Sequence, residues 1–298
     1  MDRYLITHID LDGYGCLIMA QRYLGSDIHY KCVNYDELED AIRDVPTDAE
    51  LVITDLSISN NLAPLLNEFD NLTIVDHHLT SNWLNDEGNR ARFNVVVSTE
   101  RCATYLFYEY LSARFGFKDT MLDEWARLVD DYDRYVLQYP DSRRLNALFY
   151  ISDRTRFVQE ALYCYPRQML ARNKERVDNY LENQMKYILN TTYITLSDTP
   201  KVILAFAEKN KSAIGEYHIR EKGCDLVYIL DTHSMQLSIR SKDGDESINC
   251  SKIAKLFGGG GHFHASGAIL DNFEDYFKSL CGKFPKSKEL KKFTEKEE

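Results

Sequence analysis

Three short apolar segments in the first 80 residues each end in aspartate or histidine, and this pattern constrains the fold more than any other feature of the chain. Segments with the length and β-branched content of buried strands alternate here with segments of helical periodicity. The candidate strands are 3–8, 28–34, 51–54 and 72–75, and the candidate helices are 15–24, 35–43 and 60–69. Alternating strands and helices predict a parallel sheet with helices on both faces.

The polar residues come directly after these strands. They are His8, Asp10 and Asp12 after the first strand, Asp55 after the third, and Asp76, His77 and His78 after the fourth. In an open parallel sheet the carboxyl ends of the strands share one edge, and ligands bind in the crevice there. The sequence therefore predicts that three separate runs of potential metal ligands converge at this edge.

Each motif alone also has an ordinary structural explanation. HIDLDG (8–13) is typical of a solvated turn, and Asp55 is typical of a helix cap. The pair His77 and His78 is ambiguous between core residues with satisfied hydrogen bonds and metal ligands. The combination favours a site, because the structural explanation requires three successive strands to end by chance in unpaired Asp or His.

Clustered carboxylates and imidazoles suit a pair of divalent cations. Two-metal hydrolysis uses hard oxygen ligands with a few imidazoles, and the cations lie about 3.5–4 Å apart around a shared carboxylate. Asp and His without Cys favour Mn²⁺, with Mg²⁺ or Co²⁺ as alternatives, over a structural zinc site.

The remainder of the chain changes character twice. Helices are predicted over 99–114 and 121–135, and a charged helical stretch over about 154–189 is interpreted as a connector between domains. Strand patterns return from Tyr193, and a short helix is predicted over 251–257. The Lys/Glu-rich C-terminal tail is expected to fray.

A run of four glycines, GGGGH (258–262), is followed by HASG (264–267). Glycine runs occur where the backbone approaches a neighbour closely, and successive N–H groups can form an anion-binding nest. A flexible turn before a strand explains the run equally well. Arg240, at the end of a candidate strand, favours phosphate binding because its planar guanidinium grips a phosphate with two donors.

The acidic balance of the chain argues against an extended duplex DNA footprint. The formal net charge is −11, whereas proteins that track duplex DNA carry a broad basic surface. No apolar run approaches the roughly 18 residues that span a bilayer, and the N-terminus lacks a secretory signal pattern. The seven Cys residues contain no CxxC pair, which predicts reduced thiols in a cytoplasmic protein.

Five motifs in this order resemble the DHH phosphoesterase superfamily. They are HIDLDG (8–13), ITDLS (53–57), VDHH (75–78), DDYDR (130–134) and GGGGH (258–262). The chain looks most like the RecJ-like exonucleases and the oligoribonucleases (nanoRNases), and the resemblance covers about residues 3–275. It implies a DHH catalytic domain over 1–150, a helical linker over 151–192, a smaller α/β DHHA1 substrate-binding domain over 193–284 and a charged tail over 285–298.

The resemblance also implies a role for each matching residue. The implied metal ligands are His8, Asp10, Asp12, Asp55, His77 and Asp131. The implied catalytic residues are Asp55 as bridging carboxylate, His78 facing the substrate phosphate or protonating the leaving group, and Asp76 as a ligand or as the partner that orients a histidine. The implied substrate-binding residues are Arg240, Gly259, Gly260, Gly261, His262 and His264.

Two of these assignments are less firmly tied to the family pattern. His8 precedes Asp10 by two residues, whereas some branches of the family place this histidine four residues before the paired aspartates. In the fourth motif, Asp130 and Asp133 remain alternatives to Asp131 as the ligand.

The implied activity is two-metal hydrolysis of short single-stranded oligonucleotides to nucleoside monophosphates. The alternatives are a cyclic-dinucleotide phosphodiesterase, a 3′-phosphoadenosine-phosphate phosphatase and, from another class, a catalytically silent nucleic-acid-binding scaffold. The expected partner is a short oligonucleotide or nucleotide, without a membrane, and a homodimer is left open.

Overall fold

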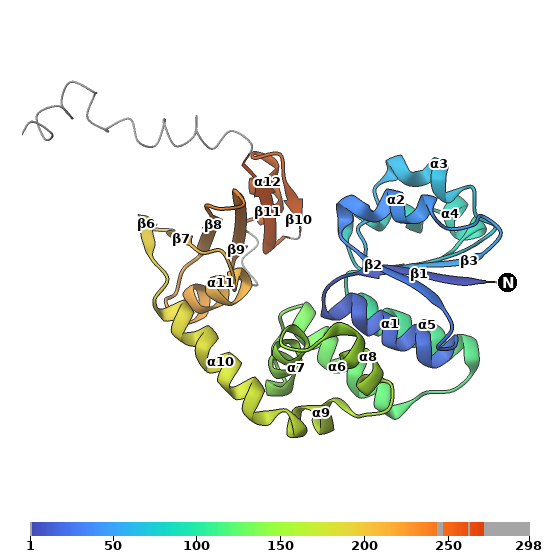
Figure 1. Ribbon diagram of the computed structural model, residues 1–298. Coiled ribbons are helices and arrows are strands. Elements are labelled where there is room, and N and C mark those ends of the chain that lie inside the picture. Colours follow the sequence, from blue (N-terminus) through green and yellow to red (C-terminus); the bar gives the residue numbers. More distant parts are fainter. Residues whose placement is uncertain (1, 243–246, 262, 271–298) are drawn as a thin grey trace, which may run out of the picture. The chain divides into compact units, whose positions relative to one another are not determined.

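The computed structural model describes residues 2–242, 247–261 and 263–270, which form two compact units (Figure 1). The first unit extends to Asn183, and the second begins at Gln184. Within the described ranges, no helix has both the length and the apolar character needed to cross a membrane.

The first unit is built on a five-stranded, fully parallel sheet with the order β2-β1-β3-β4-β5. Its strands are β1 (Arg3–His8), β2 (His29–Val33), β3 (Glu50–Thr54), β4 (Asn71–Asp76) and β5 (Asn94–Val97). The predicted α/β fold class is confirmed. The sequence did not indicate β5, because it is a four-residue edge strand with only one buried position.

Helices cover both faces of this sheet (Figure 1). On one face lie α1 (Leu11–Tyr23) and α5 (Ala103–Phe115), and on the other lie α2 (Leu38–Arg43), α3 (Ala63–Leu66) and α4 (Glu87–Arg92). Three 3-10 helices connect these elements: η1 (Tyr35–Glu37), η2 (Asn60–Leu62) and η3 (Leu79–Asn85). Side chains alternate along each central strand, so that Leu5 faces the first layer and Ile6 the second.

Further helices extend the first unit beyond the sheet. They are α6 (Thr120–Asp133), α7 (Pro140–Tyr150), α8 (Arg154–Ala161), α9 (Pro166–Arg172) and the first part of α10 (Lys174–Leu189), whose residues from Gln184 on belong to the second unit. Phe157, Met169 and Val177 are buried in the same core as α1 and α5. Residues 151–183 are therefore part of the first compact unit, because their apolar side chains recur at helical spacing and are buried.

The second unit is built on a six-stranded mixed sheet with the order β10-β11-β9-β8-β7-β6, in which only β7 and β8 are parallel. Its strands are β6 (Tyr193–Asp198), β7 (Lys201–Phe206), β8 (Leu226–Asp231), β9 (Gln236–Ser241), β10 (Gly260–Gly261) and β11 (Ala265–Ile269). Its helix α11 (Lys211–Arg220) packs on one core, and α12 (Cys250–Lys255) packs on another.

Candidate metal centre

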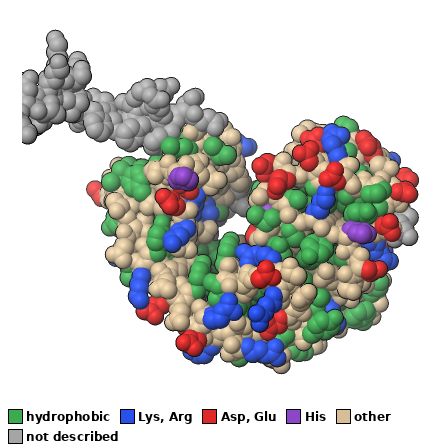
Figure 2. All heavy atoms as spheres, viewed as in Figure 1, with side chains coloured by type: hydrophobic (Ala, Val, Ile, Leu, Met, Phe, Trp, Pro, Cys, Tyr) green, Lys and Arg blue, Asp and Glu red, His purple; other side chains and the backbone are tan. Residues whose placement is uncertain are grey.

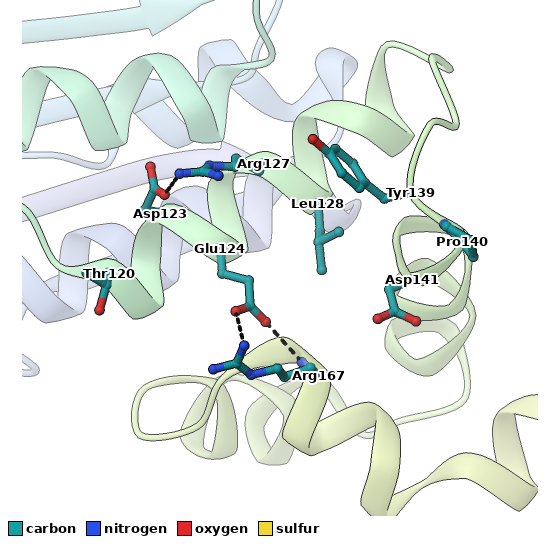
Figure 3. Close-up of a pocket in the computed structure, with 9 residues that line it drawn as sticks. All are labelled: Thr120, Asp123, Glu124, Arg127, Leu128, Tyr139, Pro140, Asp141 and Arg167. Atoms are coloured by element: carbon teal, nitrogen blue, oxygen red, sulfur yellow. Dashed lines mark hydrogen bonds and ion pairs between the residues drawn. The ribbon is translucent and has the colours of Figure 1, made fainter.

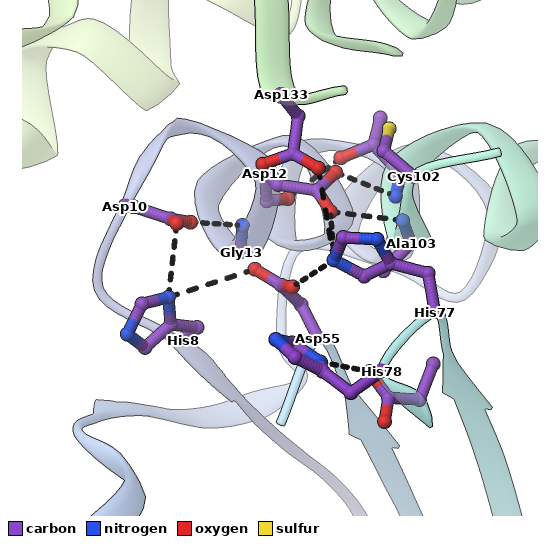
Figure 4. A network of polar contacts seen from close by, with 12 residues as sticks. His8, Asp10, Asp12, Gly13, Asp55, His77, His78, Cys102, Ala103 and Asp133 are labelled. Atoms are coloured by element: carbon purple, nitrogen blue, oxygen red, sulfur yellow. Dashed lines mark hydrogen bonds and ion pairs between the residues drawn. The ribbon is translucent and has the colours of Figure 1, made fainter. Parts of the chain in front are cut away.

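The polar residues at three strand ends are neighbours because β1, β3 and β4 are adjacent and parallel. His8 is the last residue of β1, Asp55 directly follows β3, and Asp76 is the last residue of β4. The side chains of His8, Asp55 and His77 point toward one another (Figure 4). The arrangement follows from the topology, since parallel strands bring their carboxyl ends to one edge.

The turn between β1 and α1 positions the first pair of aspartates. Asp10 is the N-cap of α1, and its Oδ1 accepts a hydrogen bond from the N–H of Gly13 at 3.0 Å. The helix was predicted to begin at residue 15, but this cap starts it at Leu11 and so places Asp12 in its first turn.

Asp12 is held by the N-terminus of α5. Its two carboxylate oxygens accept hydrogen bonds from the N–H groups of Ala103 and Thr104, each at 2.8 Å. The hydroxyl of Thr104 also donates to the backbone carbonyl of Asp12 at 2.6 Å. The free N–H groups at a helix N-terminus stabilise negative charge, so α5 fixes this buried carboxylate in the centre.

Asp55 occupies the middle of the centre. Its Oδ1 lies 3.3 Å from His77 Nε2, and its Oδ2 lies 3.7 Å from His8 Nδ1. Its backbone φ of 54° is in the left-handed region, which is uncommon for a residue other than glycine and often marks functional sites. Asp55 thus contacts imidazoles from both neighbouring strands.

Of the three aspartates of the fourth motif, the structure brings Asp133 to the other candidate ligands. Asp133, at the end of α6, points into the centre (Figure 4), and its Oδ2 lies 3.6 Å from His77 Nε2. Asp131 instead accepts hydrogen bonds from the N–H groups of Gln138 and Tyr139 at 2.8 and 3.1 Å, so it fixes the turn after α6. Asp130 is also used elsewhere, because it pairs with Arg101 and Arg134.

His78 belongs to a hydrogen-bonded chain beside the ligand cluster. Its Nδ1 lies 2.7 Å from Asp76 Oδ1, and its Nε2 lies 3.1 Å from the hydroxyl of Tyr35. Asp76 also accepts a hydrogen bond from the hydroxyl of Ser81. Asp76 therefore orients His78. The contact with Tyr35 was not anticipated, because no sequence pattern links these distant residues.

The side chains form two ligand groups that meet at Asp55. Ligand atoms of His8, Asp10 and Asp55 lie within 4.8 Å of one another, as do those of Asp12, His77 and Asp133. A third such set, at the same limit, is Asp55, Asp76, His77 and His78. Two groups joined by one carboxylate provide the donors that a pair of divalent cations requires.

Mutual repulsion among the carboxylates is visible in their pKa values. Burial, followed by the charges of Asp10 and Asp12, raises the pKa of Asp55 well above its ordinary value. Burial also raises the pKa of Asp133 to about 8, although the nearby His77 acts in the opposite direction. Burial by itself would lower the pKa of His77, but Asp133 and Asp12 raise it.

A bound cation fits this donor set. His8 Nδ1 and Asp55 Oδ2 are buried and have no hydrogen-bond partner among the described residues, although each lies close to another ligand atom. Buried polar atoms normally have a partner, and a cation would supply it while relieving the repulsion between carboxylates. Oxygen and imidazole donors suit Mn²⁺ or Mg²⁺, and no thiol belongs to the ligand groups of the described residues.

Comparisons with known proteins point the same way, although no family model matches the chain. The chain is 29% identical over 304 residues to oligoribonuclease NrnB of Bacillus subtilis (strain 168), covering 92% of this chain and 74% of that protein. It is 20% identical over 342 residues to a 3′,5′-cyclic-nucleotide phosphodiesterase of Helicobacter pylori, covering 93% and 95%. The structure of RecJ from Thermus thermophilus in complex with Mn²⁺ matches with a TM-score of 0.59 at 13% identity, covering 95% of this chain and 52% of that chain.

These similarities fit the DHH phosphoesterase superfamily, which the five motifs resemble. The chain is a phosphoesterase, as the resemblance of its five motifs implied. The chain resembles RecJ in fold, and it resembles NrnB in sequence over nearly its whole length.

Gly13 allows the close approach between β1 and α1. A Cβ at this position would lie 2.0 Å from the carbonyl oxygen of His8. We expect Gly13→Ala to lower the free energy of unfolding by about 1–3 kcal/mol and to weaken Mn²⁺ binding, because the turn that carries Asp10 must shift. Gly88→Ala is the matched control, since nothing lies within 4 Å of its Cβ. Equal thermal midpoints for Gly13→Ala and the wild type would contradict this account.

Metal binding to this phosphoesterase is expected to strengthen as the pH rises from 6 to 8. The carboxyl of Asp133, with its pKa raised to about 8, is protonated below that pH, and its proton competes with the cation. The apparent Kd for Mn²⁺ should therefore rise by up to about tenfold for each pH unit below 8, per proton released. Calorimetric titrations at several pH values measure this slope. A Kd independent of pH would contradict it.

The predicted substrate-binding residues belong to the second unit. Arg240 on β9 pairs with Ala265 on β11, so Arg240 and His264 lie near the same end of the sheet. The guanidinium of Arg240 donates to the carbonyls of Ile239 and Ser266, at 2.9 and 3.3 Å. The Nδ1 of His264 lies 2.9 Å from the hydroxyl of Ser241. His262 lies outside the described residues.

The glycine run has a structural use that the sequence left open. The N–H groups of Gly258 and Gly259 donate to the carbonyls of Lys255 and Ala254, at the C-terminus of α12. A Cβ at position 259 would lie 2.1 Å from the carbonyl oxygen of Gly267, so this residue must be glycine to let the chain reach β11. The N–H groups of Gly258 and Gly259 are therefore engaged and do not form the predicted anion nest, while Gly260 and Gly261 pair with β11.

A separate cavity of 440 Å³ lies beside α6 (Figure 3). Its lining residues are Thr120, Asp123, Glu124, Arg127, Leu128, Tyr139, Pro140, Asp141 and Arg167. Arg127 pairs with Asp123, and Arg167 Nη1 lies 3.6 Å from Glu124 Oε2. Its arginines are thus already paired, and it contains none of the ligand-group residues, so it is not part of the metal centre.

Proposed function

We propose that this chain is a metal-dependent phosphodiesterase that hydrolyses short single-stranded oligonucleotides to nucleoside monophosphates. The observation that carries the proposal is the pair of ligand groups joined by Asp55. The similarity to oligoribonuclease NrnB supports short oligonucleotides as the substrate class.

Two divalent cations, with Mn²⁺ as the first choice, would occupy the two ligand groups. One would be held by His8, Asp10 and Asp55, and the other by Asp12, His77, Asp133 and the shared Asp55. Cations bound in this way lower the pKa of water and neutralise charge on the phosphoryl group. His8 is the third member of the first ligand group because of its position in space, although it precedes Asp10 by only two residues.

His78 is the proposed proton donor to the departing oxygen, and Asp76 is its orienting partner. The contact of 2.7 Å between His78 Nδ1 and Asp76 Oδ1 supports this division of roles. A carboxylate behind an imidazole fixes its tautomer and orientation, as a general acid requires. Neither residue is needed to complete the two ligand groups that meet at Asp55.

The second unit is proposed to act as the DHHA1 substrate-binding domain, with Arg240, His262, His264 and the glycine run near the phosphate. Arg240 is half-buried and well ordered by its own sheet, which supports a positioned cation. Nothing lies within 4 Å of a Cβ built at Gly260, so the fold would accept another residue at this position. That freedom favours a role for Gly260 in contact with substrate.

Surface charge supports a short substrate. The formal net charge is −11, and Figure 2 shows Lys and Arg side chains interspersed with Asp and Glu on the visible face of the first unit. A long nucleic acid requires many phosphate contacts from a continuous basic surface.

A cytoplasmic location is part of the proposal and is supported by the six unpaired cysteines of the described residues. A homodimer is compatible with it.

A cyclic-nucleotide phosphodiesterase is the second candidate function. It is favoured by the similarity to the Helicobacter pylori 3′,5′-cyclic-nucleotide phosphodiesterase, which covers 93% of this chain. The same ligand groups serve either substrate, because both reactions cleave a phosphodiester.

A substrate panel with Mn²⁺ tests the proposal. A 5′-labelled dinucleotide, a longer single strand, a cyclic dinucleotide and a 3′,5′-cyclic mononucleotide would be compared, with an EDTA-treated sample as control. We expect kcat/KM for the dinucleotide to exceed that for each of the others by at least about tenfold. Hydrolysis of a cyclic substrate alone would support the second candidate. Tight binding of the single strand without hydrolysis of any substrate would overturn both and favour a silent scaffold.

A further inference from the structure

The corner between α7 and α8, formed by Phe149, Tyr150 and Arg154, lies against the helix that Asp10 caps. That helix, α1, is in contact with α8. Tyr14 stands one turn after Asp10, and its N–H donates to the carbonyl of Asp10 at 3.0 Å. The ring of Tyr14 packs against that of Phe149, with centroids 5.2 Å apart. The ligand group that contains Asp10 is therefore joined to this corner through one side chain, all within the first unit.

Arg154 is held in place at this corner and still has unused hydrogen-bond donors. Its guanidinium lies over the ring of Phe149, 3.8 Å from the centroid. Its Nη1 donates to the carbonyls of Phe149 and Ser152, so this nitrogen serves the backbone at the end of α7. Within the described part of the chain, no carboxylate pairs with Arg154 and no hydrogen bond uses its Nε or Nη2. A fixed guanidinium with unused donors is suited to bind a phosphate.

Tyr150 places an exposed aromatic ring beside this guanidinium. The ring meets that of Phe149 edge-on, with centroids 5.7 Å apart and planes at 74°. The guanidinium carbon of Arg154 lies 5.7 Å from the centroid of the Tyr150 ring. Tyr150 is the last residue of α7 and is 55% exposed. Aromatic rings bind nucleobases by stacking, without reading the sequence, so the corner combines a group for a base with a group for a phosphate.

The charge of the metal centre reaches Tyr150. Desolvation, followed by the negative charge of Asp10, raises the pKa of the Tyr150 hydroxyl, and the positive charge of Arg154 acts in the opposite direction. Arg154 also acts to lower the pKa of Tyr14, although desolvation raises that pKa to about 12. Interactions between charges weaken with distance and with screening by the solvent. The corner is therefore close to Asp10 in electrostatic terms as well as through its packing.

We propose that Tyr150 and Arg154 form a nucleotide subsite beside the ligand group that contains Asp10. Tyr150 stacks on the base, and Arg154 binds a phosphate of the same nucleotide through Nε and Nη2. The inference rests on the proposed function, since it concerns how a short oligonucleotide is held at that site. A substrate with few phosphates gains little from diffuse charge, so a few placed contacts must supply its affinity.

Two probes separate the base from the phosphate. Adenosine 5′-monophosphate carries both, ribose 5′-phosphate carries only the phosphate, and neither contains a phosphodiester to be cleaved. Their Kd values would be measured by calorimetry on the full chain with Mn²⁺, for the variants Tyr150→Phe, Tyr150→Ala, Arg154→Lys and Arg154→Gln. The matched controls are Tyr163→Ala, because Tyr163 is 81% exposed, and Arg156→Gln, at an exposed position of the same helix. The Kd for Mn²⁺ and the KM and kcat for a dinucleotide complete the readouts.

We expect the wild type to bind adenosine 5′-monophosphate about tenfold more tightly than ribose 5′-phosphate, as stacking of one base predicts. Tyr150→Ala should remove this difference and raise KM, whereas Tyr150→Phe should keep it, because the ring is retained. Arg154→Gln should weaken the binding of both probes about tenfold, and Arg154→Lys should weaken it less, because the charge remains. The Kd for Mn²⁺ should stay unchanged in all four variants, and both controls should match the wild type.

Three results would overturn the inference. They are equal affinities of the wild type and Tyr150→Ala for adenosine 5′-monophosphate, an affinity for ribose 5′-phosphate that Arg154→Gln leaves unchanged, or a loss of Mn²⁺ binding in Tyr150→Ala, which would show that this residue supports the metal centre instead. If the wild type hydrolyses no substrate of the panel, the proposed function fails, whereas the titrations with the two probes still decide whether the subsite exists.

Discussion

Asp55→Asn is expected to lower kcat for Mn²⁺-dependent hydrolysis by on the order of 10³-fold while the protein remains folded. Asp55 belongs to the ligand group of His8 and Asp10, and its carboxylate also lies 3.3 Å from His77 of the other group, with His8 at 3.7 Å. An amide offers one neutral oxygen where a carboxylate offers two charged ones, so neither cation would be held as before. Steady-state kinetics and Mn²⁺ titration measure the loss.

The metal-free stability of the Asp55→Asn variant distinguishes a lost ligand from a damaged fold. Burial and the nearby Asp10 and Asp12 raise the pKa of Asp55, which means that its charged form is unfavourable in the metal-free protein. We therefore expect the thermal midpoint without metal to be equal to or above that of the wild type. Asp48→Asn, at an exposed position, is the matched control and should retain full activity. Wild-type activity in the Asp55→Asn variant would contradict the account.

Asp133→Asn and Asp131→Asn are expected to have opposite effects. Asp133 faces His77 at 3.6 Å, so its amide variant should weaken Mn²⁺ binding by about 10²-fold, in the upper range of losses seen at metal sites. Asp131 receives two backbone hydrogen bonds, so its amide variant should keep Mn²⁺ binding and lose about 1–3 kcal/mol of stability. Calorimetry with Mn²⁺ and denaturant unfolding separate the two outcomes.

The pH dependence of stability gives a second test of Asp133. Its pKa is raised from 3.8 to about 8, so the folded metal-free protein holds a proton that the unfolded chain releases. Stability from this group is present below pH 4 and is lost as the pH rises toward 8. Asp133→Asn should flatten that slope, while Asp131→Asn should leave it unchanged. Loss of Mn²⁺ binding in the Asp131 variant alone would contradict the assignment.

The sheet and its ligand-bearing edge could be predicted because they depend on local pattern. Strand ends are marked by the change from β-branched residues to Asp or His, and parallel topology brings such ends together without any knowledge of side-chain packing. This reasoning placed His8, Asp55 and His77 at one edge of the sheet, where the structure has them.

The orientation of side chains at a helix end could not be predicted in the same way. Asp130, Asp131 and Asp133 are separated by about 100° per residue around α6, so only packing decides which of them faces the centre. Asp130 forms ion pairs with Arg101 and Arg134 and so does not face the site. Asp131 accepts a hydrogen bond from the N–H of Gln138 in the turn after the helix.

Contacts between segments far apart in the chain could not be predicted from the sequence either. Tyr35 meets His78 across 43 positions of the chain, and no periodicity encodes that meeting. Residues 151–183 read as a connector because charged helices look alike whether or not their apolar faces are covered, yet Phe157 and Val177 are fully buried. The glycine run suggested an anion nest, while two of its N–H groups serve the C-terminus of α12.

The most direct test is a crystal structure of the Mn²⁺-soaked protein with anomalous diffraction at the manganese edge. Two peaks about 3.5–4 Å apart are predicted on either side of Asp55, one beside His8 and Asp10 and the other beside Asp12, His77 and Asp133. Absence of both peaks, or manganese bound only at sites remote from Asp55, would contradict the account.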